Sequence, residues 1–254
     1  MERNDRAAAV TFFSSDTFIP GTSVGLGEDA AQHARVIRIG AGEPVELRNG
    51  SGLGARGILA RVAKRSLSVE VSDTWEIPSL PPVHMLVPVA DRERMLYLAE
   101  KVTELSGTSW RPVMWRRSRS VGPAGDGPAF HSRLKGRMIA ALTQSRGGWL
   151  PEVYPAAPLS RAIAAAPEGS RVLLDAGAEN SLLSLELNGP VSIALGPEGG
   201  LDAKERDEMI EGGFTPASLV GGTLRFETAG IAALAIVRAM LGTVPADANQ
   251  IEGV

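Results

Sequence analysis

The feature that most constrains the fold is a change of sequence pattern at residues 77–82. This stretch, IPSLPP, holds three prolines in six residues, and such a segment is stiff and suits a linker. Before it, short apolar runs are separated by Gly and Ser turns, a pattern typical of strands. After it, strand-length apolar runs alternate with segments of helical periodicity. We therefore expect a β-rich domain over residues 1–77 and an α/β domain with a mostly parallel sheet over residues 83–254.

The expected elements of the first domain are three strands and one helix, at Pro44–Leu47, Arg56–Val62, Leu67–Val71 and Glu28–Ile39 respectively. The strands expected in the second domain are His84–Val89, Arg111–Trp115, Arg171–Asp175, Val191–Leu195 and Ser218–Val220. The helices expected there are Asp91–Ser106, Ser132–Gln144, Asp202–Glu211 and Thr228–Leu241. Asp202 is a predicted N-cap, and Glu205 three residues later completes the pattern of a capping box.

Residue types exclude several kinds of site. The chain has no Cys, which excludes a disulfide, a Cys-bound zinc and a thiolate nucleophile. It has three His and no HExxH spacing, so a metal site is not expected. The apolar stretch 230–241 is too short to span a bilayer, and the first residues lack the pattern of a secretion signal. We expect a cytoplasmic protein with no membrane or metal partner.

Positive charge gathers in the middle of the chain. Residues 111–146 hold eight Arg and Lys against one Asp, although the net charge of the whole chain is −3. Phosphate backbones respond to local potential rather than to net charge. The stretch is therefore a candidate RNA contact, and a solvated basic surface explains it equally well.

Two glycine-rich segments differ in their context. GSGLGARG (50–57) lies between expected strands, so it predicts a hairpin turn rather than a dinucleotide site, and no Walker A pattern occurs. IALGPEGG (193–200) runs from a strand into a turn that a helix follows. Glycines at the carboxyl end of a strand let a ligand approach the backbone closely. A tight turn without a ligand is the equal alternative for this segment alone.

A third segment, LVGGTLRFETAG (219–230), places Arg225 and Glu227 between an apolar strand and an apolar helix. Charges at such a junction need partners, and a structural Arg–Glu pair is the simplest account. Taken together with the glycine turn upstream, a shared ligand pocket is the better interpretation.

LGPEGGLDAKE (195–205) followed by LVGGTLRFETAGIAAL (219–234) resembles the C-terminal signature of the SPOUT superfamily of methyltransferases. Within it, the chain resembles the bacterial 16S rRNA uridine-N3 methyltransferase family. KVTEL (101–105) is similar to the KxTELG stretch of that family, and QSR (144–146) with LP (150–151) to its QSxR…P segment. HARVIR (33–38), with GE (42–43) and NGSG (49–52), is similar to its N-terminal pattern.

The resemblance implies a SPOUT α/β domain with a deep trefoil knot and a mostly parallel sheet, preceded by a small PUA-like β-barrel that binds RNA. It implies S-adenosyl-L-methionine (SAM) as the cofactor, 16S rRNA of the small ribosomal subunit as the partner, and a homodimer. The cofactor-binding residues that it implies are Leu174, Leu195, Gly196, Pro197, Glu198, Gly199, Gly200, Leu219, Gly221, Leu224, Arg225, Thr228 and Ala229.

The chemistry of uracil N3 sets the candidate catalytic residues. N3 carries a proton and is a weak nucleophile until that proton is lost, so the site should stabilise the uracil anion or accept the proton. Arg225 is the candidate for stabilising the anion. The candidates for orienting the base or accepting the proton are Glu227, Glu104 and Glu198, each equally well explained as a cap or a salt bridge. The candidate RNA contacts are Arg38, Arg116, Arg119, Arg137, Gln144 and Arg146.

The chain departs from the family pattern at two places. Gly222 stands where the family has an Arg two positions before Leu224, and Ser106 where it has a Gly. These changes leave SAM binding as the firmer expectation and the target nucleotide as the weaker one. Two other functions stay open, a SPOUT ribose 2′-O-methyltransferase acting on rRNA or tRNA and a non-catalytic RNA-binding protein that keeps the knot as a scaffold.

Overall fold

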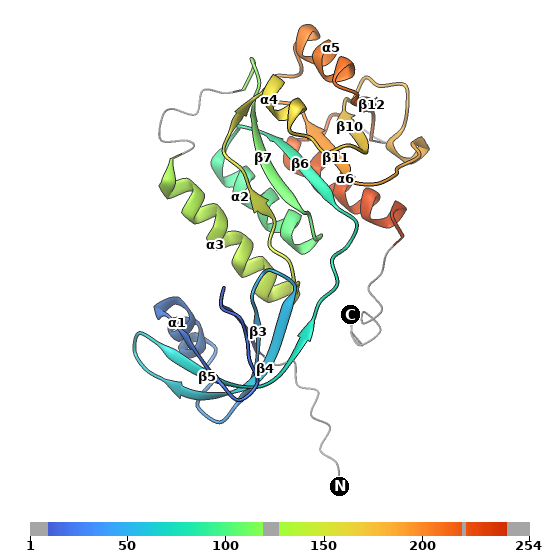
Figure 1. Ribbon diagram of the computed structural model, residues 1–254. Helices are drawn as coiled ribbons and strands as arrows, with labels where there is room; N and C mark the ends of the chain where they lie inside the picture. Colours follow the sequence, from blue (N-terminus) through green and yellow to red (C-terminus); the bar gives the residue numbers. More distant parts are fainter. Residues whose placement is uncertain (1–9, 119–126, 220–221, 243–254) are drawn as a thin grey trace. The chain divides into compact units, whose positions relative to one another are not determined.

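The computed structural model describes residues 10–118, 127–219 and 222–242 (Figure 1). The chain folds as two compact units. The first comprises residues up to Ser79 together with Ile139–Leu150, and the second comprises Leu80–Met138 together with the residues from Pro151 onward. The chain passes from the first unit to the second between Ser79 and Leu80, inside the proline-rich segment.

The first unit is built on a five-stranded sheet in the order β1-β3-β4-β5-β2. β1 pairs with β3 in parallel, and the other pairs are antiparallel. Alternating residues of β4 and β5 are buried, as expected for a sheet with one face on a core, and the sheet is curled in Figure 1. Its elements are β1 Val10–Phe13, β2 Ser23–Leu26, α1 Glu28–Val36, β3 Pro44–Arg48, β4 Leu53–Val62 and β5 Leu67–Glu76.

The glycine-rich segment of the first unit is a hairpin turn between β3 and β4, as its context predicts. Asn49 Oδ1 accepts hydrogen bonds from the backbone of Ser51 at 2.8 Å and of Leu53 at 3.0 Å. Gly52 has φ +86°, and a Cβ there would lie 2.3 Å from the indole of Trp149. Trp149 Nε1 also donates to the carbonyl of Ile77 at 2.9 Å. These contacts attach residues 146–150 to the first unit.

The second unit is built on a seven-stranded sheet in the order β12-β10-β11-β6-β7-β8, and β9 pairs with β7 off this path. Every one of these pairs is parallel. The strands are β6 Val83–Pro88, β7 Ser109–Met114, β8 Glu152–Val153, β9 Ala157–Pro158, β10 Ser170–Leu174, β11 Val191–Leu195 and β12 Thr215–Ala217. All five residues of β11 are buried, as is typical of a central strand covered on both faces.

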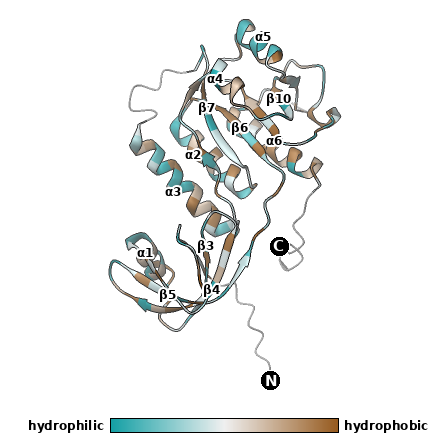
Figure 2. Ribbon diagram, in the orientation of Figure 1, coloured by the Kyte–Doolittle hydropathy of each residue, from teal (hydrophilic) through white to brown (hydrophobic). Residues whose placement is uncertain are grey.

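Helices cover both faces of this sheet. On one face, Leu159 of α4 and Met209 of α5 share a core with Leu86 and Ala194. On the other face, α6 packs on α2 and β11, where Gly230 approaches Leu98 and Leu195 closely. In Figure 2, α6 carries mostly hydrophobic residues and α5 mostly hydrophilic ones. The helices are α2 Arg92–Glu104, α3 Pro128–Ser145, α4 Leu159–Ala164, η1 Leu182–Ser184, α5 Ala203–Glu211 and α6 Phe226–Met240.

Three local expectations need correction. The helix expected over Glu28–Ile39 ends at Val36, because Arg38 adopts the left-handed φ of +60°. The last strand of the described residues is Thr215–Ala217, and it includes Pro216, which an edge strand tolerates. Of the strand expected at Ser218–Val220, Ser218 forms an isolated bridge with Ser181, and Val220 lies outside the described residues. Asp202 caps α5 by accepting from Lys204 N at 3.1 Å, but Glu205 does not complete a capping box. Its Oε1 instead accepts from the backbone N–H of Arg116 at 2.6 Å.

Candidate active site

The glycine turn follows the carboxyl end of β11. Gly200 N donates to the carbonyl of Pro197 at 2.9 Å, and Gly200 has φ +76°, a conformation that favours glycine. A Cβ at Gly199 would lie 3.1 Å from Cβ of Arg117, whose Nη1 donates to the carbonyl of Gly199 at 3.4 Å. The turn therefore stands at the edge of the parallel sheet where ligands of α/β proteins bind.

The segment that leads into α6 reaches the same edge of the parallel sheet. Residues 222–225 lead into α6, with Arg225 as its N-cap residue. A Cβ at Gly230 would lie 2.9 Å from Cδ1 of Leu195 and 3.0 Å from Cδ1 of Leu98, so the missing side chain lets α6 lie directly on β11 and α2. This close packing brings the start of α6 beside the glycine turn.

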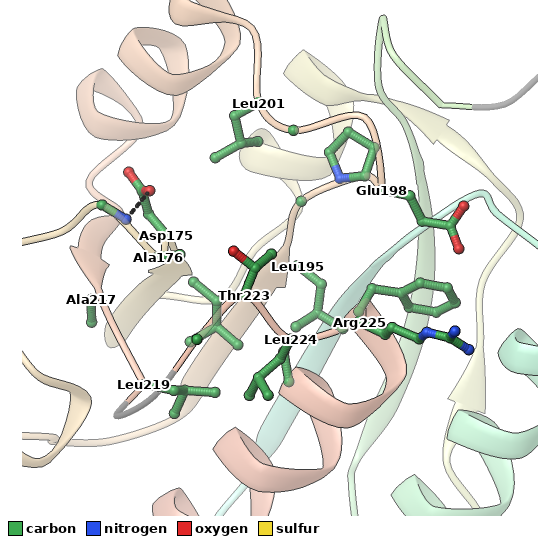
Figure 3. Close-up of a pocket in the computed structure, with 18 of the residues that line it drawn as sticks. Asp175, Ala176, Leu195, Glu198, Leu201, Ala217, Leu219, Thr223, Leu224 and Arg225 are labelled. Carbon is green, nitrogen blue, oxygen red and sulfur yellow. Dashed lines mark hydrogen bonds between the residues drawn. The ribbon is translucent and has the colours of Figure 1, made fainter.

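The two segments and the residues after β10 enclose a cavity of about 750 Å³. Figure 3 shows Asp175 on one side of it, Glu198 and Arg225 on the other, and Leu195, Thr223 and Leu224 between them. The residues that line the cavity are Arg94, Leu174, Asp175, Ala176, Gly177, Leu195, Gly196, Pro197, Glu198, Gly200, Leu201, Arg206, Ala217, Leu219, Gly222, Thr223, Leu224, Arg225, Phe226 and Ala229. The wall is apolar in its middle and charged on both sides.

The charged group on one side is an ion pair. Arg206 Nε lies 2.8 Å from Asp175 Oδ2, and Gly177 N donates to Asp175 Oδ1 at 3.0 Å. Burial alone would raise the pKa of the Asp175 carboxyl, but the hydrogen bonds from Arg206 and Gly177 and the charge of Arg206 hold its pKa below the ordinary value. Asp175 is therefore a fixed carboxylate that can accept hydrogen bonds from a ligand.

The other side holds two carboxylates and two arginines. Arg94 Nη1 donates to Glu198 Oε1, and Arg94 Nε lies 3.8 Å from Glu227 Oε1. Glu227 is buried behind this wall and is not among the lining residues. Arg225 is exposed at the cavity and takes part in none of the ion pairs of the described residues. It is thus a cation that a ligand can reach.

Most of the predicted cofactor residues meet at this cavity. Gly199 packs against Arg117 instead, Thr228 is exposed at the start of α6, and Gly221 lies outside the described residues. The trefoil knot that the resemblance implies stays a prediction. The predicted cofactor residues that line the cavity are Leu174, Leu195, Gly196, Pro197, Glu198, Gly200, Leu219, Leu224, Arg225 and Ala229.

Among the predicted catalytic residues, the structure brings Arg225 to the cavity and Glu227 to a buried position behind its wall, but it does not bring Glu104 there. Glu104 ends α2, ten residues beyond Arg94, and at 1.5 Å per residue that is about 15 Å along the helix. Its Oε1 binds Lys101 Nζ at 2.7 Å, and Lys101 also binds Glu100 at 2.9 Å. The hydrogen bonds that Lys101 donates to the carboxylates of Glu104 and Glu100 raise the pKa of Lys101. Within this chain Glu104 has a structural partner and no place at the cavity.

The predicted RNA contacts are divided between the two units. Arg116 and Arg137 belong to the second unit, where their side chains lie 3.4 Å from Asp202 and 3.5 Å from Glu100. Arg38, Gln144 and Arg146 belong to the first unit. The Arg146 carbonyl accepts from Arg48 Nε at 3.3 Å. Arg119 lies outside the described residues.

Several cavity residues were not predicted from the sequence. Arg94 reads as a polar position of an amphipathic helix, and Asp175 and Arg206 read as a strand end and a helix surface. A spacing rule cannot pair Asp175 with Arg206 or Arg94 with Glu198, because only the sheet order brings these elements together. One signal was present, since Asp175 follows a buried strand directly, where a polar residue is often functional.

The described residues hold no group of three or more His, Asp or Glu side chains placed to bind a metal ion. None of the helices in the described ranges is both long and apolar enough for a membrane span.

Comparison with known proteins identifies the family. Residues 78–238 match the family described as the RNA methyltransferase domain. The chain belongs to this family. A ribosomal RNA small subunit methyltransferase E of Synechocystis is 30% identical over 218 residues, which cover 82% of this chain and 69% of the relative. The match begins at residue 78, so the methyltransferase domain contains the whole cavity.

Solved structures share the fold over both units. A methyltransferase of Legionella pneumophila with bound SAM has a TM-score of 0.85 at 24% identity, covering 91% of this chain and 97% of that one. A ribosomal RNA small subunit methyltransferase E of Neisseria gonorrhoeae, also bound to SAM, has a TM-score of 0.83 at 23% identity, covering 91% and 98%. The expected α/β domain with a mostly parallel sheet, preceded by a small β-rich domain, is confirmed.

Proposed function

We propose that this methyltransferase transfers the methyl group of SAM to N3 of a uridine in the 16S rRNA of the small ribosomal subunit. The observation that carries the proposal is the cavity in which LGPEGG and TLRFETAG meet at the carboxyl edge of the parallel sheet. The family membership and the SAM-bound structures with the same fold support it. An rRNA substrate fits a cytoplasmic enzyme, and a homodimer follows the family.

The cavity suits SAM in size and chemistry. Pockets for ligands of this size range over about 300–1,000 Å³ and are mostly apolar with a few polar groups. Here Leu174, Leu195, Leu219, Leu224 and Ala229 offer apolar wall for an adenine ring. Asp175 offers a carboxylate for hydroxyl or ammonium groups, and the arginines offer cations for a carboxylate. Bound SAM supplies a methyl group on a positively charged sulfur, which leaves with the electron pair of the broken C–S bond.

Arg225 is the residue that we assign to the acceptor. Uracil N3 becomes a good nucleophile when its proton is lost, and the negative charge then spreads to the two carbonyl oxygens on either side of N3. An arginine that lines the cavity and has no carboxylate partner among the described residues can stabilise that charge. It acts with the positioning of the base, which holds N3 near the methyl group. Glu198 is the carboxylate on the cavity wall that can orient the base.

Mass spectrometry of methylated RNA tests the proposal. Small subunits or their naked 16S rRNA are incubated with the protein and SAM, digested to nucleosides and compared with N3-methyluridine. Appearance of this nucleoside with wild type, and its absence with Arg225→Ala, is the expected result. A methyl group on a ribose 2′ oxygen would identify a 2′-O-methyltransferase instead, and RNA binding without any methyl transfer would favour a non-catalytic scaffold.

A further inference from the structure

Arg94 is a charged residue of the cavity to which the proposed transfer assigns no role. It binds two carboxylates: its Nη1 donates to Glu198, and its Nε lies 3.8 Å from Glu227. The three side chains come from three elements, the first turn of α2, the turn after β11 and the first turn of α6. Arg94 therefore connects both cofactor segments to a helix that contributes no other residue to the cavity wall.

Glu227 makes this connection energetically important. Its side chain is 9% exposed, and its Oε2 has no hydrogen-bond partner among the described residues. The N-terminal end of α6 stabilises a negative charge there. This stabilisation is smaller than the hydration energy that the carboxylate loses on burial. Among the described residues, the ion pair with Arg94 is the one that Glu227 forms. Removing the cation from such a pair leaves a buried charge uncompensated, which costs more than removing both partners.

Arg94 is itself fixed independently of the cavity. Asp91 caps α2, and its Oδ1 accepts a hydrogen bond from the backbone N–H of Arg94 at 3.1 Å. The side chain is about one-third exposed, so it stands at the edge of the cavity rather than in the core. The cap thus sets the position from which the guanidinium reaches the two carboxylates.

We propose that Arg94 is a positioning residue that preforms the SAM cavity. By binding Glu198 and Glu227 together, it holds the turn Gly196–Gly200 against the start of α6. A cavity that is already formed binds its ligand without the cost of ordering two segments. The inference rests on the proposed function, because it concerns the affinity of the same cavity for SAM.

A double-mutant cycle with Arg94→Met and Glu227→Gln tests this role. SAM affinity is measured by isothermal titration calorimetry, and melting temperature is recorded for each variant. Arg94→Met should weaken SAM binding about tenfold or more. Arg94→Lys should recover part of the loss, because a lysine pairs with one carboxylate where the arginine fork pairs with two. Glu227→Gln placed in the Arg94→Met background should restore the melting temperature, because no unpaired buried charge remains, but SAM affinity should stay weak, because the bridge between the turn and α6 is still missing.

Arg133→Met is the matched control. Arg133 of α3 pairs at 2.9 Å with Glu93, which lies on α2 as Arg94 does, and neither residue lines the cavity. It should leave SAM affinity unchanged. Wild-type affinity in Arg94→Met would overturn the inference. So would a double variant that regains wild-type SAM affinity, since the loss in Arg94→Met would then come from the unpaired charge of Glu227 alone. A wild-type protein that binds no SAM would overturn the proposed function, and this inference with it.

Discussion

Helix α6 has an arginine at each end, and the two differ in their exposure and in their hydrogen bonds. Arg225 precedes the helix, is exposed at the cavity and caps nothing with its side chain. Arg238 lies near the other end, where Nε donates to the carbonyl of Leu105 at 3.1 Å and Nη1 to that of Pro81 at 2.5 Å. Nη2 donates to the carbonyl of Ser106, and burial lowers the pKa of Arg238 to about 10.

The difference shows how to separate a structural cation from a functional one. Arg238 satisfies three backbone acceptors, two at the carboxyl end of α2 and one in the proline-rich segment, so its charge is already used by the fold. The Arg225 side chain makes no capping hydrogen bond, and its charge lies beside the cavity. Helix α6 is therefore held in place by an arginine at one end and has an exposed arginine at the other.

The largest effect is expected from Arg225→Ala. Loss of one group that stabilises developing negative charge lowers kcat about 100- to 1,000-fold. The melting temperature should change little, because the Arg225 side chain makes no capping hydrogen bond. Single-turnover methyl transfer and thermal unfolding measure the two quantities. A destabilised variant that still transfers methyl groups at the wild-type rate would make Arg225 a structural residue like Arg238.

Arg238→Met should show the reverse. The carbonyls of Pro81, Leu105 and Ser106 lose their donor, and the free energy of unfolding should fall by about 2–4 kcal/mol. The folded fraction should transfer methyl groups at an unchanged rate. Denaturant unfolding combined with activity per folded molecule checks this prediction. A variant with wild-type stability and no activity would contradict the contrast between the two ends.

Gly230→Ala tests the packing of α6 against β11 and α2 between these two arginines. The added methyl group would crowd Leu195 and Leu98, an overpacking cost of about 1–3 kcal/mol that the helix propensity of Ala offsets by about 1 kcal/mol. We expect a net loss of about 1 kcal/mol and weaker SAM binding, because α6 moves away from β11. The control is Ala235→Gly at an exposed position of α6, which loses helix propensity alone. Unchanged SAM affinity in Gly230→Ala would separate the packing from the cavity.

The smallest effect is expected from Asp175→Asn at the opposite side of the cavity. Folding lowers the pKa of Asp175, so below about pH 4 the unfolded chain binds more protons than the folded one. Its contribution to stability is complete above that range and is lost as the pH falls through the folded pKa. The variant should lose under about 1 kcal/mol at neutral pH, as expected of an ion pair whose arginine side chain is 39% exposed. Thermal unfolding between pH 3 and 7 should show a shallower acid limb than wild type; an identical limb would contradict the assignment.

Local patterns predicted the elements of this fold well. Val191–Leu195 is a strand with the bounds that its apolar run indicates, and Asp202 caps α5 as its position suggests. The fold class followed from the alternation of strands and helices together with the signature in the last segments. These properties depend on residues close together in the sequence, which is why the sequence reveals them.

Long-range contacts could not be predicted in the same way. Glu205 has the spacing of a capping box, yet it binds the backbone of Arg116, 89 residues upstream. Arg94 binds Glu198 across 104 residues. Both contacts depend on which strands are neighbours in the sheet, and neither leaves a local pattern. Three of the charged residues of this cavity, Arg94, Asp175 and Arg206, were therefore missed by sequence reasoning.

Calorimetric titration of SAM into wild type and Ala229→Trp tests the central claim, that the cavity between the glycine turn and α6 is the cofactor site. Ala229 lines the cavity, and Ala239→Trp, at an exposed position of the same helix, is the control. We expect one SAM bound per chain in wild type and in Ala239→Trp, and none in Ala229→Trp. Equal binding by all three proteins would show that SAM binds elsewhere and would contradict the assignment of this cavity.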